Sequence, residues 1–409
     1  MSVKTDEKRI GNAVKNNSAF FAILLCWIAY ITAYVGRYSY SSNIISIQAA
    51  FSTDSATTGL VSTCFFFAYG AGQVINGILC KYYRKRYVVS LALITSATVN
   101  FIFFLGVPFS FMKYLWLING ISQSFLWSSF IYLLSKNLSE AQLSRANVMM
   151  STTVPLGTFL AYGCSALFVK IDYTITFLIA SIFMLFSAVL WFFSFKGAFS
   201  FDCEVKTAGE KGEKRRIGSE VFTVIAALAL LAIANNLVRD GLMTWLPSIL
   251  KKSFGLSDSL SIILTLVLPV LGVLGTFLNA SLRKRFSSFV TLSGMWFALS
   301  FAALFGVILL LSTSYWYYLL ALLGLISVFM YAVNNVITSM APLYMRNKVN
   351  SGLLAGTLDG FCYVGSAIST YGLGAVADRY DWNGVFYLLL LVCLFGVLVS
   401  FASSLKRKG

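Results

Sequence analysis

The sequence predicts an all-α integral membrane protein with twelve transmembrane helices in two pseudo-symmetric halves of six. Three observations predict this fold class: the apolar composition, a series of long apolar segments, and a repeat that relates the two halves. Of the 409 residues, 58% are hydrophobic and only 11% are charged, whereas soluble domains contain about 25% charged residues. So little charge cannot cover the surface of a water-soluble protein, and we expect much of the surface to face lipid.

Twelve apolar segments, each long enough to cross a bilayer as a helix, follow one another along the chain. Backbone N–H and C=O groups find no water inside a bilayer, so each segment is expected to be helical. The first is longer than a signal peptide and lacks a small-residue cleavage site, so it is expected to remain as a helix. The segments are residues 19–49, 57–82, 87–105, 114–134, 146–169, 174–195, 221–250, 259–282, 289–311, 315–342, 351–377 and 384–405.

The basic residues are unevenly divided between the two sides of the predicted bundle. With the N-terminus in the cytoplasm, 24 of the 31 Lys and Arg residues fall on cytoplasmic segments and five on external loops. This positive-inside bias predicts a multi-pass protein of the cell membrane with both termini in the cytoplasm. It also accounts for the net charge of +16, so we expect no nucleic-acid partner.

One long polar stretch divides the chain. Residues 198–219 are rich in Gly and charge and are predicted to form a cytoplasmic linker. They separate an N-terminal half, residues 1–197, from a C-terminal half, residues 220–409.

Two features recur at nearly the same offset in the halves. The basic triplet at 84–86 is followed 199 residues later by another at 283–285, and Arg37 and Arg239 are 202 residues apart. Two parallel repeats of six helices are typical of transporters that bind substrate between the halves, near the membrane midplane.

Apart from Lys81 at the cytoplasmic end of span two, Arg37 and Arg239 are the basic residues within predicted spans. A charged side chain at the centre of a membrane helix costs about 2.5–3.5 kcal/mol on insertion scales and is a functional candidate by default. We expect the two guanidinium groups to face each other and to bind an anion with paired oxygens, such as phosphate or carboxylate. The alternative for Arg37 is extension to the outer membrane surface.

The composition also excludes several kinds of site. The chain contains no histidine, which excludes histidine-based metal sites, Ser-His triads and histidine proton relays. The seven cysteines lie within spans, at an inner helix end or in the linker, so reduced thiols are expected rather than a disulfide framework. We expect no cofactor, no bound metal and no enzyme activity.

Around the two arginines the sequence resembles the organophosphate:phosphate antiporter family of the major facilitator superfamily, which includes glycerol-3-phosphate and hexose-phosphate transporters. The sharpest match is "RDGLMTWLPSIL", with Arg239, Gly241, Trp245 and Pro247 at the family's spacings. The resemblance extends along nearly the whole chain. Further matches are Tyr30 and Tyr34 before Arg37, Tyr69, Gln123 with Trp127, Tyr331, Tyr363 in "FCYVGS", and the stretch "GAVADRYDWNGVF".

The resemblance implies that Arg37 and Arg239 hold the phosphate, that tyrosines line the cavity, and that the halves rock about it. Helical spacing independently places Tyr30, Tyr34 and Arg37 on one face. The alternative for any single tyrosine is a residue of the interfacial belt.

The sequence also departs from the family pattern in the predicted spans. Gln73 stands where characterised members have a lysine, Val154 where they have a histidine, and Asn236 where they have a tyrosine. At the cytoplasmic end of span two, Lys81 stands where the superfamily usually has an aspartate. The two arginines are kept but other polar groups of the phosphate site are not, so the sequence supports an anionic substrate more firmly than phosphate itself. Gln73 and Asn236 are retained as candidate substrate-binding residues.

Two carboxylates, Asp240 and Asp359, lie within predicted spans. Neighbouring residues on a helix point about 100° apart, so Asp240 is expected to pair with another helix rather than with Arg239. Asp359 lies one turn before Tyr363 on the same face. We hypothesise that Asp359 pairs with a cavity arginine when substrate is absent, or carries a coupling proton. The alternative is an ion pair that only fixes helix packing.

Together these observations predict a monomeric secondary active transporter of a small organic anion, favouring a sugar phosphate or glycerol phosphate. Transport would proceed by alternating access with phosphate antiport or proton coupling. Two alternatives remain from the sequence: a transporter-like membrane sensor for a phosphorylated metabolite, and a transporter of a carboxylate.

Overall fold

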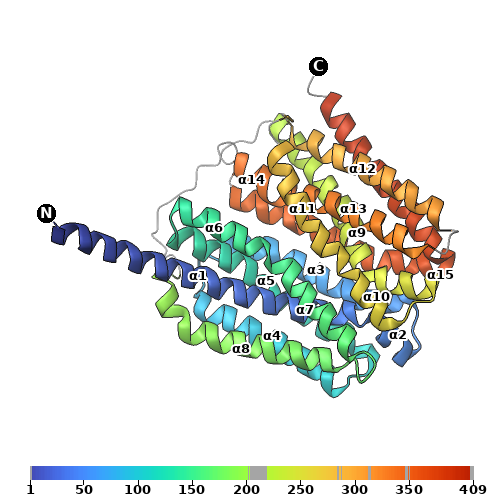
Figure 1. Ribbon diagram of the computed structural model, residues 1–409, viewed down its shortest axis with the longest axis horizontal. Helices are drawn as coiled ribbons and strands as arrows, with labels where there is room; N and C mark the ends of the chain where they lie inside the picture. Colours follow the sequence, from blue (N-terminus) through green and yellow to red (C-terminus); the bar gives the residue numbers. More distant parts are fainter. Residues whose placement is uncertain are drawn as a thin grey trace.

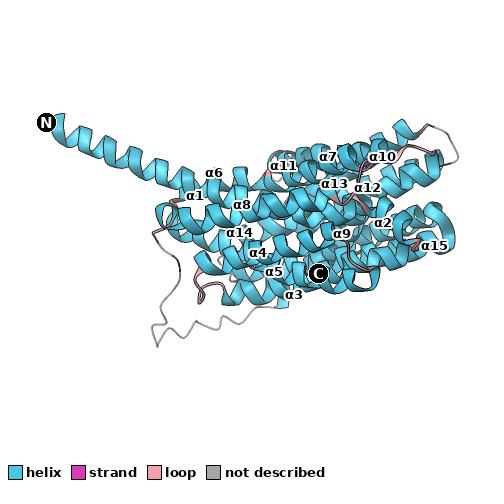
Figure 2. Ribbon diagram, turned by 90° about the horizontal axis from the view of Figure 1, so that it is seen from below, coloured by secondary structure: helices cyan, strands magenta, loops and turns pink. Residues whose placement is uncertain are grey.

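The computed structural model describes residues 2–200, 202, 219–282, 285–286, 288–311, 315–345, 349 and 351–405. Within these residues the regular secondary structure is entirely helical (Figure 2). The predicted linker, 198–219, lies outside the described residues except for Ala198–Ser200, Asp202 and Ser219. Of the second basic triplet, only Arg285 is described. The division into two halves therefore stays a prediction, and "first half" and "second half" below mean α1–α8 and α9–α15.

The first half contains eight helices that account for predicted spans one to six. Spans one and five are each built from two helices, because the helix is interrupted at Asn43 and at Thr152. The helices are α1 (Ser2–Ser42), α2 (Ile44–Phe51), α3 (Ser55–Leu79), α4 (Lys85–Leu105), α5 (Phe109–Asn137), α6 (Glu140–Ser151), α7 (Thr153–Phe168) and α8 (Ile175–Ala198).

The second half contains the elements of predicted spans seven to twelve. Span eight is interrupted at Leu266, and span ten passes through a short π-helical turn, η1. The elements are α9 (Ser219–Phe254), α10 (Asp258–Thr265), α11 (Val267–Leu282), α12 (Phe289–Leu310), α13 (Trp316–Asn335), η1 (Val336–Met340), α14 (Ala341–Tyr344) and α15 (Ser351–Leu405).

Spans eleven and twelve form one continuous element, α15, with a sharp kink between them. Tyr380 and Asp381 leave the helical conformation there, and Asp381 has φ 56°. Aspartate tolerates positive φ better than most residues. After the kink Trp382 packs against Trp245 of α9, with ring centroids 5.6 Å apart. The kink lets two membrane-length helices follow each other without an intervening loop.

Among the described residues, nine helical stretches are long and apolar enough to cross a membrane. One of them, Leu353–Ser403, contains both spans of α15. Two predicted spans, represented by α5 and by α6 with α7, are not among the nine. They are more polar, as in "NGISQS" of α5 and "EAQLSRAN" of α6. With these spans the twelve-span fold class is confirmed.

The two halves lie side by side, with α1–α8 (blue to green) next to α9–α15 (yellow to red) in Figure 1. The first part of α15 packs against both α3 and α9, so it joins the halves. A side chain at Gly59 of α3 would overlap the backbone carbonyl of Thr370 on α15. Glycine is therefore required where these two helices approach most closely.

Several hydrogen bonds join the halves at the end of the bundle where α2 and α10 lie, opposite the N-terminus (Figure 1). Asp378 of α15 accepts the backbone N–H groups of Ser55 (3.0 Å) and Ala56 (2.7 Å) at the start of α3. The Tyr162 hydroxyl of α7 donates to the Met243 carbonyl of α9 at 2.8 Å. A carboxylate at a helix N-terminus is favourable because the helix dipole is positive there. These contacts close this end of the bundle.

Candidate substrate-binding site

Arg37 lies in the interior of the bundle on α1, and its side chain is 3% exposed. Its Nε donates to Gln123 Oε1 of α5 at 3.2 Å, and its Nη1 donates to the Tyr363 hydroxyl of α15 at 3.0 Å. Nη2 has no hydrogen-bond partner among the described residues. Arg37 therefore does not extend to the membrane surface, and it connects the two halves while one guanidinium nitrogen stays unpaired.

Aromatic side chains surround the Arg37 guanidinium. Its carbon lies 4.2 Å from the ring centroid of Tyr69 and 4.5 Å from that of Tyr34. Phe65, which the sequence analysis did not single out, adds a third ring at 5.3 Å. Rings at these distances attract a cation through their electron-rich faces. Neutral groups thus contact the Arg37 guanidinium, and no carboxylate of the described residues forms an ion pair with it.

Hydrogen bonds join three further predicted residues beside this guanidinium. The hydroxyl groups of Tyr30 and Tyr69 are 3.4 Å apart, and Gln73 Nε2 donates to the Tyr69 hydroxyl at 2.7 Å. Ser128 of α5 donates to Gln73 Oε1 at 2.9 Å. The structure thus brings Tyr30, Tyr69 and Gln73 together beside Arg37, with Gln73 as an uncharged member.

Arg239 of α9 has a different environment. Its Nε donates to Asp240 Oδ1 at 2.8 Å, and the two side chains are 16% and 5% exposed. The expectation that Asp240 would not pair with Arg239 is wrong. The directions of neighbouring Cβ atoms argue against the pair, but the long arginine side chain bends around the helix and brings Nε back to its neighbour.

Asp240 is also bound by groups outside this ion pair. Its Oδ2 accepts hydrogen bonds from Ser366 Oγ of α15 at 2.5 Å and from Asn236 Nδ2 at 3.4 Å. Asn236 in turn donates to Ser366 Oγ at 3.1 Å. The carboxylate therefore does contact another helix, as predicted, but through a serine that sequence reasoning missed. Helical spacing could have identified Ser366 as a candidate, because it lies three residues after Tyr363 on the same helical face.

Tyr331 of α13 and Asp359 of α15 complete the set of predicted residues. The Arg239 guanidinium carbon lies 5.3 Å from the Tyr331 ring centroid. Asp359 is half-buried and lies within electrostatic range of Arg37, Arg239 and Asp240. It forms no ion pair within 4.0 Å in the part of the chain that the structure describes. Arg239 is paired with Asp240 instead.

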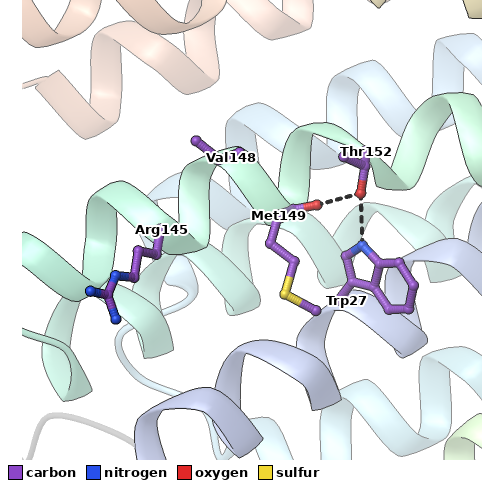
Figure 3. Close-up of a pocket in the computed structure, with 5 residues that line it drawn as sticks. All are labelled: Trp27, Arg145, Val148, Met149 and Thr152. Carbon is purple, nitrogen blue, oxygen red and sulfur yellow. Dashed lines mark hydrogen bonds between the residues drawn. The ribbon is translucent and has the colours of Figure 1, made fainter. Parts of the chain in front are cut away.

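A cavity of about 380 Å³ opens along the same helix, ten residues before Arg37. Trp27 forms one wall and donates from Nε1 to Thr152 Oγ1 at 2.9 Å, while Met149 lies against the indole (Figure 3). Arg145 points away from the ring (Figure 3). None of the predicted site residues lines this cavity, so it is separate from the two arginines.

A sequence model described as the Major Facilitator Superfamily matches residues 26–355. The match covers most of the chain. This protein belongs to the Major Facilitator Superfamily.

Several members of the superfamily are similar to this chain along most of its length. A "Probable hexose phosphate transport protein" of Chlamydia muridarum is 23% identical over 404 residues, which cover 91% of this chain and 88% of that protein. "Sugar phosphate exchanger 3" of Bos taurus is 21% identical, over 82% and 77% of the two chains. These relatives confirm the predicted resemblance to the organophosphate:phosphate antiporters.

Other similarities are shorter or concern only the fold. "Membrane sensor protein UhpC" of Escherichia coli is 26% identical over 107 residues, so this chain spans about a quarter of that protein's length. The structure of a bacterial homologue of the human lysosomal transporter Spinster, in an inward-facing conformation, has a TM-score of 0.75 at 13% identity and covers 95% of this chain. The nucleoside transporter NupG has a TM-score of 0.69 at 12% identity. These structures support the facilitator fold of this chain.

Proposed function

We propose that this facilitator is a secondary active transporter of a small organic anion, with a sugar phosphate as the favoured substrate. The observation that carries the proposal is the buried Arg37 guanidinium, 3% exposed, whose Nη2 has no hydrogen-bond partner among the described residues. A charged donor left unsatisfied inside a protein is costly. A phosphoryl oxygen at this nitrogen would complete its hydrogen bonding.

The relatives support the choice of substrate. Proteins named for hexose phosphate transport and sugar phosphate exchange match this chain along most of its length. The hydroxyls of Tyr30 and Tyr69 and the amide of Gln73 offer hydrogen bonds to sugar hydroxyl groups beside Arg37. We propose that these residues, with Tyr34, Gln123, Tyr363, Arg239, Asn236 and Tyr331, contact the substrate.

Alternating access fits the way the halves are joined. Asp378 and Tyr162 link the halves at one end, while Arg37 links them at mid-bundle through Tyr363. In alternating access, opening this end would break the Asp378 contacts as the halves rotate about the site. We propose that the protein works as a monomer in the cell membrane with both termini in the cytoplasm.

Phosphate exchange is the proposed coupling, with proton coupling through Asp359 as the alternative. Transport measured against external pH in an Asp359→Asn variant separates the two. A pH dependence that becomes flat assigns the coupling proton to Asp359. Unchanged exchange and unchanged pH dependence would remove Asp359 from the mechanism and leave it a packing role.

Reconstitution tests the function. The purified protein is placed in liposomes preloaded with phosphate, and uptake of glucose 6-phosphate, glycerol 3-phosphate and a dicarboxylate is measured, with empty liposomes as the control. We expect uptake of a phosphate ester that depends on internal phosphate. Uptake of the dicarboxylate alone would identify a carboxylate carrier instead.

A sensor is the second candidate, favoured by the match of 107 residues to UhpC. It predicts saturable binding of a phosphate ester to the purified protein without flux in the same liposomes. Binding and flux measured on one preparation therefore decide between the two functions.

A further inference from the structure

The candidate site contains two positive and two negative side chains. Asp240 is paired with Arg239, and Asp359 lies within electrostatic range of Arg37, Arg239 and Asp240. With all four ionised the formal charges cancel. Gln73, which stands beside Tyr69, adds a hydrogen-bonding group but no charge.

The two guanidinium groups also differ in how freely they can bind an anion. Arg239 is in contact with Asp240 at 2.8 Å, and Asp240 is further held by Ser366 at 2.5 Å. Arg37 has neutral partners, Gln123 and Tyr363, and an unpaired Nη2. An incoming anion therefore meets one available guanidinium, because the second is already neutralised by a fixed carboxylate.

A site of this kind discriminates by charge. An anion with one negative charge matches the single available guanidinium of Arg37. A second negative charge would lie near Asp240 and Asp359 without a free cation, and unpaired charge is strongly disfavoured where water is excluded. Two unopposed arginines would instead favour a doubly charged phosphate.

We propose that the site selects a singly charged anion: the monoprotonated form of a phosphate ester, or another ester of the same shape with one charge. This deepens the proposed function and rests on it. Asp240 is the residue that sets the charge preference, because it occupies the second guanidinium.

The effect of pH on titratable groups near Arg239 and Asp240 must be distinguished from its effect on the charge of the ligand. Tyr38 of α1, Tyr162 of α7, Tyr331 of α13 and Asp359 of α15 lie within electrostatic range of Asp240. Asp258 of α10 lies at the closed end in its own ion pair with Lys251 at 2.7 Å. A ligand whose charge does not change with pH reports the titration of these protein groups alone.

The experiment compares glucose 6-phosphate with glucose 6-sulfate, whose sulfate ester keeps one negative charge across the whole pH range. Dissociation constants are measured from ligand-induced thermal stabilisation of the purified protein at pH 5.5 and pH 8. The second pKa of a phosphate ester is about 6, so its singly charged form falls from most of the ligand to about 1%. We expect glucose 6-phosphate binding to weaken roughly 75-fold between these pH values, and glucose 6-sulfate binding to stay within about twofold.

The Asp240→Asn variant tests the assigned residue. Asparagine keeps a hydrogen-bonding side chain but frees Arg239, so glucose 6-phosphate should bind at pH 8 at least about tenfold more tightly than to the parent protein. Asp258→Asn is the matched control, since it removes a carboxylate that lies 35% exposed outside the site, and its constants should equal those of the parent. If Asp240→Asn is not recovered folded, the two-ligand comparison on the parent protein still decides.

The outcomes separate this proposal from the proposed function. Glucose 6-phosphate that binds equally well at both pH values would overturn the charge preference and leave the transporter proposal standing. Weakening of both esters in parallel would assign the effect to protein titration and overturn the preference as well. Absence of binding by these esters and by glycerol 3-phosphate would overturn both.

Discussion

Arg37 and Arg239 are 202 residues apart and occupy corresponding helices of the two halves, yet their surroundings differ. Arg37 is bound by an amide and a hydroxyl and is surrounded by aromatic rings. Arg239 is bound by a carboxylate. The partners also differ in location, because Tyr363 belongs to the other half from Arg37, whereas Asp240 and Tyr331 belong to the same half as Arg239.

The two arginines occupy equivalent positions in the repeat, but their neighbouring side chains give them different roles. An arginine with neutral partners keeps its full charge for a ligand. An arginine beside a fixed carboxylate is partly neutralised, and its guanidinium orientation is set by that contact. We therefore expect Arg37 to contribute more to anion binding than Arg239, and the following variants test that order.

The largest effect is expected for Arg37→Lys. Lysine presents a point charge in place of a planar fork, so it cannot contact Gln123, Tyr363 and a substrate oxygen together. Loss of two charged hydrogen bonds at about 1.5 kcal/mol each corresponds to a decrease of roughly 100-fold in the initial rate of phosphate exchange. The exposed Arg84→Lys serves as the control and should match the parent. Exchange above a third of the parent rate would contradict the role given to Arg37.

Arg239→Lys should have a smaller effect, about tenfold on the same rate, equivalent to roughly 1.4 kcal/mol. A lysine ammonium can keep the ion pair with Asp240, so one of the interactions of Arg239 survives. Both variants should be assayed in one series of liposomes at equal protein density. A larger loss of rate for Arg239→Lys than for Arg37→Lys would contradict the expectation that Arg37 contributes more to anion binding.

Tyr363→Phe removes the hydroxyl that accepts from Arg37 Nη1 at 3.0 Å and keeps the ring. The net value of such a bond is about 1 kcal/mol, so we expect roughly a fivefold weaker apparent affinity for the phosphate ester. Tyr371→Phe is the matched control, since Tyr371 lies on the same helix and is 47% exposed. Equal affinities for the two variants would mean that the bond across the halves does not support binding.

The smallest effect is expected for Asp378, whose contacts with the start of α3 hold the two halves together at one end of the bundle. Asp378→Asn weakens the carboxylate contact with the start of α3, which is worth about 0.3–1 kcal/mol at a helix N-terminus. Hydrogen exchange in residues 53–60 should become about two- to fivefold faster. Asp258→Asn, at the same end of the bundle, is the control. Unchanged exchange in Asp378→Asn would show that this carboxylate does not hold the end closed.

Much of the fold could be predicted because apolar length and charge asymmetry are local properties of the chain. The boundaries were less accurate where helices break or join. The predicted loop between spans eleven and twelve is a kink at Tyr380 and Asp381, since two backbone residues outside helical geometry are enough to redirect the chain. The interruption at Thr152 lies just before Pro155, which has no N–H to bond the Ser151 carbonyl one turn earlier.

Sequence reasoning grouped several of the candidate residues correctly in space but missed one of their pairings. Helical spacing placed Tyr30 and Tyr34 with Arg37, and the structure brings Tyr69, Gln73 and Gln123 to the same group. The pairing of Arg239 with its own neighbour was missed, because side-chain length and rotamer decide it rather than helical phase.

By itself the sequence determined a membrane protein of twelve helices with two intramembrane arginines, since composition and periodicity act along the chain. The tertiary structure decided how those arginines differ. Ser366 holds Asp240 from another helix, and Tyr363 reaches Arg37 from the other half. Contacts between residues more than a hundred positions apart depend on how helices pack, and helix packing depends on close approaches such as that of Gly59 to Thr370, which no local pattern specifies.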